Sequence, residues 1–152
     1  MPNPRSIRLG LKIKLLGRSY TAHSLDTGVP HAVVEVKDLD LFPVFEAGRA
    51  LRRHPKFKPA GTNADFISIS SGKIKMRTYE RGVEDETLAC GTGAIASALV
   101  CFILGQCSSP VTVEVRSKDK LKVSFKPEGP QSFKDVWLEG PARIVFSGEL
   151  SL

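Results

Sequence analysis

The clearest pattern in the chain is a period of two near its start. The apolar positions of this segment are Ile7, Leu9, Leu11, Ile13 and Leu15. Polar residues or glycine stand between them, and this alternation is typical of a strand with one buried face. Eight further strands are indicated by alternation or by short apolar runs between turn residues. They cover residues 20–25, 31–36, 64–70, 73–80, 111–115, 121–125, 135–138 and 143–146.

Two segments have helical rather than strand patterns. Asp40 is suited to cap a helix over residues 41–52, with Pro43 tolerated in the first turn. The second predicted helix covers residues 91–104 and is apolar on nearly every side. A helix of that composition is expected to be surrounded by protein, and it is too short to span a bilayer.

These elements predict one domain that spans residues 1–152. Strands outnumber helices, and the hairpin expected around Ser71-Gly72 favours antiparallel pairing. We therefore expect an α+β fold, in which a mainly antiparallel, curved sheet wraps around one buried central helix. The helix over residues 41–52 is expected at the periphery, and segments 54–62 and 81–89 are expected to be loops.

Basic residues outnumber acidic ones, which gives a net charge of +6. Such an excess can serve nucleic acid or an anionic substrate. The lysines, however, stand at alternate positions, as in Lys12 and Lys14 or Lys118 and Lys120. That spacing is typical of the solvated face of a strand, and few aromatic residues lie between the charges. Nucleic-acid binding, whose sign would be an affinity that falls steeply with salt, is therefore disfavoured.

The chain has three cysteines and no Cys-x-x-Cys pair. This count and spacing argue against a disulfide framework and a zinc site, so we expect no metal. Free thiols fit a reducing cytoplasm. We expect no signal peptide before the first predicted strand and no membrane association. Cys101 is expected in the core and Cys107 in a loop, with Cys101 about 16 Å along the helix from Cys90.

Cys90 lies between the polar loop and the apolar helix, and Gly91, Thr92 and Gly93 follow it. The start of a helix carries unpaired N–H groups and a partial positive charge. That setting is expected to lower the pKa of a thiol from its usual ~8.5 and to bind a carboxylate. A buried structural cysteine is the alternative. The Gly-Thr-Gly run and the polar loop favour a reactive thiol, and we expect Cys90 to react fastest of the three cysteines.

Four other polar residues are candidates for the same site. Glu80 and Arg81 end a predicted strand, where glutamate can bind an ammonium group and arginine a carboxylate. The alternative is a surface ion pair of little energetic value. His31 can act as an acid, a base or an orienting group, or it can be structural. Asn63 can donate to a carboxylate or shape a turn.

Six runs of residues occur in one order along the chain. They are Gly28-Val29-Pro30-His31-Ala32-Val33, His54-Pro55 with Phe57, Thr62-Asn63-Ala64-Asp65-Phe66, Tyr79-Glu80-Arg81-Gly82, Glu86-Thr87-Leu88-Ala89-Cys90-Gly91-Thr92-Gly93-Ala94, and Gly140-Pro141-Ala142 with Phe146-Ser147-Gly148-Glu149. In this order they resemble the C-terminal half of diaminopimelate epimerases. Each run is weak alone, but together they are specific and cover essentially all of the chain.

The resemblance implies an isomerase of lysine and cell-wall precursor biosynthesis that needs no pyridoxal or other cofactor. It interconverts the LL and meso forms of diaminopimelate by inverting one α-carbon. In the family two cysteines face each other across the substrate, and one thiolate removes the α-proton while the other thiol delivers a proton to the opposite face. By resemblance Cys90 is one of this pair, with Glu80 and His31 as polar partners at the reacting centre.

The resemblance also implies how the substrate is held. Gly91 and Thr92 would donate their N–H groups to the reacting carboxylate. Arg81 would hold the distal carboxylate together with Asn63, and Glu80 would contact the substrate as well.

Two features depart from the family pattern. Val29 stands where the family often has Asn, so one distal polar contact is lost or supplied elsewhere. The Asn-Ala-Asp-Gly type of segment that carries the family's other cysteine occurs nowhere in the chain. We therefore expect a C-terminal domain, a truncated product or a split gene that is a poor epimerase alone. We expect it to associate with the absent N-terminal half or to form a homodimer by exchanging its last strand.

Two other functions remain open from the sequence. One is a different two-cysteine racemase, such as a relative of proline racemase, although Glu80 and Arg81 argue for a substrate with a second charged end. The other is a folded, inactive domain that binds an amino acid or a partner, which the missing second cysteine supports.

Overall fold

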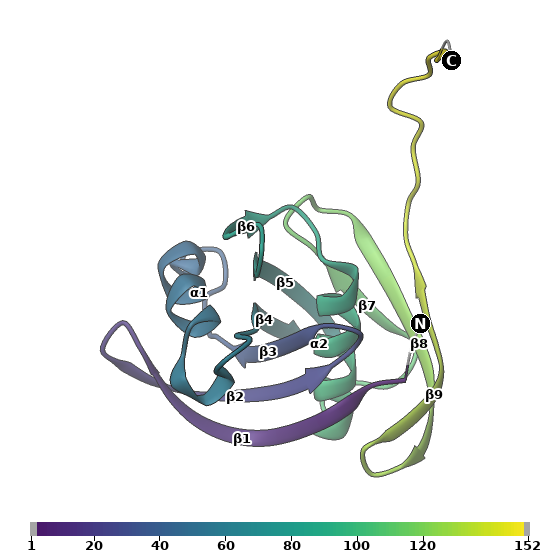
Figure 1. The fold of residues 1–152 in the computed structure, drawn as a ribbon. Helices are drawn as coiled ribbons and strands as arrows, with labels where there is room; N and C mark the ends of the chain where they lie inside the picture. The colour runs from purple at the N-terminus through teal and green to yellow at the C-terminus, as the bar shows by residue number, and fades with distance from the viewer. Residues whose placement is uncertain (1–2, 151–152) are drawn as a thin grey trace.

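The computed structural model describes residues 3–150 and has nine strands, two α-helices and one 3-10 helix in that range (Figure 1). The strands are β1 (Arg5–Leu15), β2 (Arg18–Asp26), β3 (Pro30–Glu35), β4 (Asn63–Ser70), β5 (Lys73–Glu80), β6 (Asp85–Thr87), β7 (Val111–Glu114), β8 (Lys120–Gly129) and β9 (Ser132–Glu139). The helices are α1 (Val44–Arg52), the 3-10 helix η1 (Pro55–Phe57) and α2 (Gly91–Ile103). The expected α+β class is confirmed.

The described strands form one mixed sheet in the order β1-β2-β3-β4-β5-β7-β8-β9, with β6 paired to β5. Neighbours are antiparallel except β3 with β4 and β5 with β7, which are parallel. Parallel neighbours need a long crossover connection. Each of these crossovers carries one α-helix, because α1 lies between β3 and β4 in the chain and α2 lies between β5 and β7.

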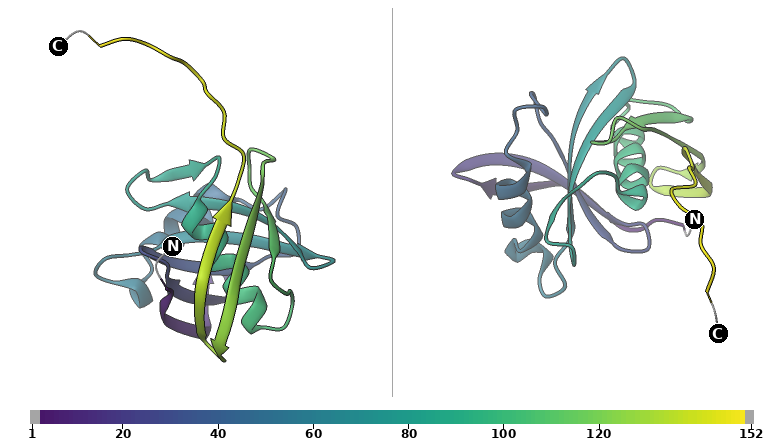
Figure 2. Two further views of the ribbon diagram at one scale, coloured as in Figure 1. Left: turned by 90° about the vertical axis from the view of Figure 1, so that its right-hand side faces the viewer. Right: turned by 90° about the horizontal axis from the view of Figure 1, so that it is seen from above.

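The middle strands separate two hydrophobic cores. On one face α2 packs against strands from both ends of the sheet, including β2, β3, β5 and β8, and its residues 93–101 are all buried. On the other face α1 packs against β4 and β5 (Figure 2). Neighbouring side chains of β3 alternate between the two cores, since Val33 belongs to the α2 core and Val34 to the α1 core.

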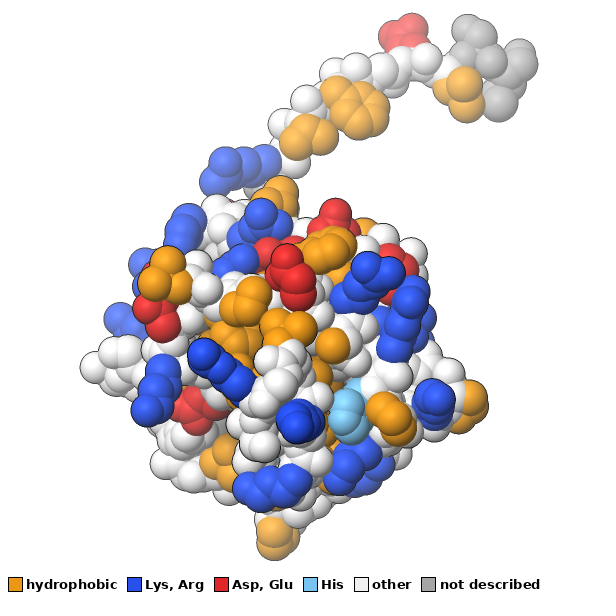
Figure 3. All heavy atoms as spheres, turned by 90° about the vertical axis from the view of Figure 1, so that its left-hand side faces the viewer, with side chains coloured by type: hydrophobic (Ala, Val, Ile, Leu, Met, Phe, Trp, Pro, Cys, Tyr) orange, Lys and Arg blue, Asp and Glu red, His pale blue; other side chains and the backbone are white. Residues whose placement is uncertain are grey.

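The surface that covers α1 has no single basic patch. Lysine and arginine side chains are scattered over it, with carboxylates and apolar side chains between them (Figure 3). No helix within residues 3–150 is long and apolar enough to cross a membrane.

The start of α1 differs from the expectation. Asp40 does not cap the helix, which begins at Val44 with Pro43 at the N-cap and no capping side chain. Asp38 instead accepts the Leu41 N–H at 3.2 Å in a turn. The physical reason is Pro43, because a proline disfavours helical backbone in the residue before it.

Two further expectations need correction. The segment over residues 81–89 is not wholly a loop, because β6 pairs with β5 there. Residues 143–146 form no strand, and the chain after β9 extends away from the body (Figures 1 and 2). Ile144, Val145 and Phe146 are consequently 84–93% exposed. An alternating pattern becomes a strand only where a neighbouring edge takes up its backbone hydrogen bonds, and no described strand does so here.

Candidate functional site

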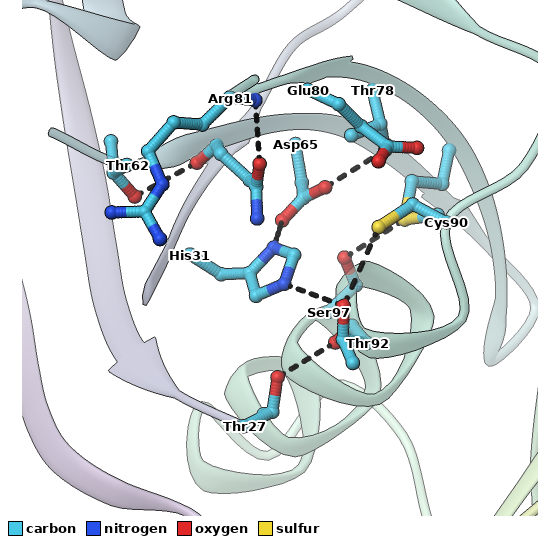
Figure 4. A network of polar contacts seen from close by, with 12 residues as sticks. Thr27, His31, Thr62, Asp65, Thr78, Glu80, Arg81, Cys90, Thr92 and Ser97 are labelled. Atoms are coloured by element: carbon cyan, nitrogen blue, oxygen red, sulfur yellow. Dashed lines mark hydrogen bonds and ion pairs between the residues drawn. The ribbon is translucent and has the colours of Figure 1, made fainter. Parts of the chain in front are cut away.

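Three strand ends and one helix start meet at the same edge of the sheet. His31 in β3 is in parallel register with Asn63, the first residue of β4. Strand β5 runs the other way, so its last residue Glu80, followed by Arg81, reaches the same edge. Helix α2 begins there too, with Cys90 at its N-cap (Figure 4). The topology therefore gathers the residues expected at the site around the start of α2.

His31 is fully buried and is contacted at both ring nitrogens. Nδ1 lies 2.7 Å from Asp65 Oδ2, and Nε2 lies 2.9 Å from Thr92 Oγ1. Asp65 is fully buried as well, and its second oxygen accepts the Thr78 hydroxyl at 2.8 Å. A carboxylate can only accept, so Nδ1 carries a proton and, in the neutral ring, Nε2 accepts from Thr92. The hydrogen-bond network thereby assigns both the orientation and the tautomer of the imidazole.

The same network reaches Cys90. Thr92 Oγ1 lies 3.5 Å from Cys90 Sγ, so one hydroxyl touches both the thiol and the imidazole. In the neutral tautomer, where that hydroxyl donates to His31, it can accept from the thiol, and when the sulfur is ionised it can donate to the thiolate. The Thr27 hydroxyl donates to the Thr92 carbonyl at 3.1 Å and ties the first turn of α2 to the turn before β3. Donors and acceptors thus run in series from Cys90 through Thr92 and His31 to Asp65.

Burial raises the pKa of the Cys90 thiol to about 12. The Asp65 carboxylate makes the next largest contribution to this rise, and Glu80 adds a smaller one. The Thr92 hydroxyl and the Gly93 N–H lower the pKa, as expected at the start of a helix, but burial and the carboxylates outweigh them. The expected lowering of this pKa is therefore wrong, and Cys90 is a neutral thiol at pH 7.

The other two cysteines lie together at the opposite end of α2. The Cys107 thiol approaches the Ala98 carbonyl at 3.6 Å. A hydrogen bond between the Cys101 and Cys107 thiols raises the pKa of buried Cys101 and lowers the pKa of half-buried Cys107. These shifts predict that Cys107 ionises more readily than Cys90, the reverse of the order expected from the sequence. Within residues 3–150, no group of three or more His, Cys, Asp or Glu side chains could hold a metal ion.

Glu80 lies on the Cys90 side of the site. Its Oε1 accepts the Thr87 hydroxyl at 2.6 Å, so β6 helps to hold the carboxylate beside the thiol. Gly91 and Thr92 are the first two residues of α2, and N–H groups at this position have no acceptor within a helix. This side therefore combines a thiol, a carboxylate and free backbone donors.

Arg81 extends in the other direction. In Figure 4 its side chain points away from Cys90, and the His31 ring lies between them. The Arg81 N–H donates to Asn63 Oδ1 at 2.7 Å, and its guanidinium donates to the Ala60 carbonyl at 3.2 Å. The site thus has a sulfur end and a guanidinium end, separated by the buried imidazole.

Several residues of the network were missed from the sequence, among them Asp65, Thr78 and Thr27. One signal was present, because Asp65 stands in an apolar strand two positions after Asn63 and therefore on the same face. A second was the repeated glycine, because a Cβ on Gly93 would lie 2.5 Å from Asp65 Oδ1. Glycine at this position lets the helix approach the buried carboxylate.

Comparison with known proteins identifies relatives along most of the chain. The family model for diaminopimelate epimerase matches residues 23–145. The diaminopimelate epimerase of Chlorobaculum tepidum is 42% identical over 151 residues, which are 98% of this chain and 56% of that protein. That of Aquifex aeolicus is 47% identical over 129 residues, which are 84% of this chain and 45% of that protein. The chain spans about half the length of these curated relatives.

Solved structures share the fold at low sequence identity. A hydroxyproline epimerase from Agrobacterium vitis superposes with a TM-score of 0.67 at 20% identity, over 90% of this chain and 46% of that one. A PhzF-family phenazine biosynthesis protein from Bacillus anthracis gives a TM-score of 0.52 at 15% identity, over 86% and 38%. At these identities the likeness concerns the fold alone.

Proposed function

The chain belongs to the diaminopimelate epimerase family, and from that premise we propose that it contributes one cysteine to the inversion of an α-carbon of diaminopimelate. The reaction interconverts the LL and meso forms and uses proton transfer by thiols rather than a pyridoxal cofactor. Cys90 is the proton-transferring residue of this chain, and Glu80 and His31 are its polar partners.

The observation that carries this proposal is the hydrogen-bonded series from Cys90 to Asp65 at the start of α2. An amino-acid α-proton is far less acidic than a thiol, so fixed donors must stabilise charge that develops on the substrate carboxylate. The free N–H groups of Gly91 and Thr92 can supply them. Because its pKa is raised, Cys90 rests as a thiol and suits proton delivery, and the same sulfur removes the proton in the reverse direction.

The distal end of the substrate is assigned to the guanidinium end of the site. Arg81 can present a planar fork to a carboxylate, and Asn63 holds the Arg81 backbone in place. A second charged end on the substrate favours diaminopimelate over proline-like substrates, which have no second carboxylate to engage Arg81.

Inversion without moving the substrate needs a second acid or base on the opposite face. Cys101 and Cys107 do not provide it, because Cys101 lies about 16 Å from Cys90 along α2 and the Cys107 thiol packs beside Ala98, in the same end of the helix as Cys101. We assign the opposing cysteine to a part outside residues 3–150, either a segment equivalent to the other half of the relatives or a second copy of this chain. Residues 141–150 offer it a docking segment, because exposed apolar side chains favour association.

Incubation of the chain with LL-diaminopimelate in heavy water tests the proposal. We expect slow α-deuteration by the chain alone and faster exchange and epimerisation after addition of the N-terminal half of a relative. The Cys90→Ala variant should lose both, whereas Cys107→Ala, which removes a thiol at the far end of α2, should retain them. Exchange that survives in Cys90→Ala would remove this cysteine from the reaction.

Substrate choice is tested in the same assay. Diaminopimelate should be deuterated in preference to proline at equal concentration. Faster exchange into proline would instead favour another two-cysteine racemase. Binding of diaminopimelate without exchange, even with the added half, would indicate an inactive binding domain.

A further inference from the structure

Strand β1 is irregular on both sides of Arg8. Between Arg5 and Arg8, and again between Arg8 and Leu11, β1 carries one residue more than the facing stretch of β2. Ser6, inside the first of these bulges, has a φ of 55°, which is uncommon for a residue other than glycine. Bulges re-aim side chains and often occur next to functional sites. The backbone therefore gives the side chain of Arg8 a direction that a regular strand would not.

The Arg8 side chain is held in that direction. Its Nε donates to the hydroxyl of buried Ser24 at 3.1 Å. Its guanidinium carbon lies 5.7 Å from the centre of the Phe57 ring, within the range of a cation–π contact. A guanidinium oriented in this way loses less conformational entropy on binding an anion than a freely moving one.

Within the part of the chain that the structure describes, Arg8 also has no acidic partner. Arg52 and Arg77, by contrast, form ion pairs with Glu84 and Glu86 at 2.9 and 2.6 Å. Among residues 3–150, neither Arg8 nor Arg81 forms an ion pair with a carboxylate. Both guanidinium groups therefore keep donors for an anion that the described chain does not supply.

The two arginines line one cleft of about 450 Å³. Its charged or titratable lining residues are Arg8, Asp26, His31, Lys56, Lys58 and Arg81. The single carboxylate among them, Asp26, is already paired with Arg5 at 3.7 Å. Cations consequently dominate the cleft, and His31 connects it to the network that ends at Cys90.

From these observations we infer that Arg8 is a specificity-determining residue, which together with Arg81 binds the carboxylate at the substrate end remote from Cys90. The inference rests on the proposed function for the identity of that substrate. It adds the residue that selects a dicarboxylate, because two oriented guanidinium groups favour a second carboxylate over a neutral or cationic end.

Binding of pimelate, a seven-carbon dicarboxylate, tests this role. Heptanoate, the monocarboxylate of equal length, is the reference ligand, and calorimetry on the full chain at constant ionic strength gives both affinities. The wild-type chain should bind pimelate more tightly than heptanoate. The Arg8→Gln variant should bind pimelate about tenfold more weakly than wild type and heptanoate with little change. Arg8→Lys should lie between them, since it keeps the charge but loses the planar fork.

Lys12→Gln is the matched control. Lys12 lies on the same strand, and its amino group donates to the Thr21 hydroxyl at 3.0 Å, as Arg8 does to Ser24. It does not line the cleft. Lys12→Gln should leave pimelate binding within twofold of wild type. An equal loss in both variants would mean that diffuse positive charge, not Arg8, attracts the ligand. Equal affinity of wild type for pimelate and heptanoate would also overturn the inference.

Exchange of the α-hydrogen separates this inference from the proposed function. Pimelate binding that depends on Arg8, with no diaminopimelate exchange even after the other half is added, supports the anion site and contradicts the epimerase. Exchange that depends on Cys90, with unchanged pimelate binding in Arg8→Gln, supports the epimerase and removes Arg8 from the site. Should Arg8→Gln fail to fold, Arg8→Lys carries the same comparison.

Discussion

Replacement of Asp65 by Asn should lower the stability of the fold and make the Cys90 thiol easier to ionise. The two carboxylate oxygens of Asp65 accept from His31 and Thr78, and all three side chains are buried. An amide has one oxygen acceptor and a donating NH2 group, so one of the two buried donors loses its partner. Such a loss costs about 1–3 kcal/mol. At about 2 kcal/mol, the melting temperature of a chain of this size should fall by about 4–8 °C.

The same substitution should make Cys90 easier to ionise. The Asp65 carboxylate is the second largest cause of the raised pKa of that thiol, after burial. The Asn side chain is neutral, so Cys90 stays buried but no longer has a carboxylate that repels its thiolate. The pH profile of Cys90 alkylation should therefore move below its wild-type midpoint, which we expect near pH 12. Alkylation followed by peptide mass spectrometry measures this at the single residue.

Asp135→Asn provides the control. Asp135 pairs with Lys126 at 2.8 Å, about as close as Asp65 and His31, but its side chain is 49% exposed. The two variants therefore differ mainly in burial, and Asp135→Asn should leave the melting temperature and the Cys90 profile unchanged. A stable Asp65→Asn chain with an unshifted Cys90 profile would refute the reasoning.

Three other outcomes are expected. Gly93→Ala should destabilise the fold by about 1–3 kcal/mol in denaturant titrations, because its Cβ would meet Asp65, although alanine normally favours a helix over glycine. Cys107 should be alkylated faster than Cys90 at pH 7–8, where its lowered pKa gives more thiolate; the opposite order in mass spectrometry would contradict the assigned shifts. A chain that ends at Gly140 should sediment as an assembly of fewer chains than the full chain does, while it melts at the same temperature. The same number of chains in both assemblies would exclude a role of the tail in association.

Hydrophobic periodicity was sufficient for the strands with an apolar face. It located most of β1 from Ile7 to Leu15, but it did not reveal the bulges beside Arg8, because they depend on the register with β2. It also could not find β6, whose residues are all polar. That strand is held by pairing with β5 and by the Glu86–Arg77 ion pair at 2.6 Å, and neither interaction is visible as a local pattern.

The part of the site that lies at strand ends could be predicted from the sequence. His31 and Glu80 stood at the ends of predicted strands and Asn63 directly before one, and the sheet order brought these ends together. The pKa of Cys90 was not predictable in this way. The direction of its shift depends on how deeply the sulfur is buried and on Asp65, which lies in another element. The sequence showed only that Cys90 stands at the start of a helix.

The burial of α2 along residues 93–101 limits which part of the molecule can move when a ligand binds. A helix buried along residues 93–101 and packed on strands from both ends of the sheet cannot tilt without opening a core. The thiol of the N-cap residue Cys90 is therefore held in a fixed position. Any closing motion around a substrate must therefore come from elements other than α2, and the thiol stays in place while they move.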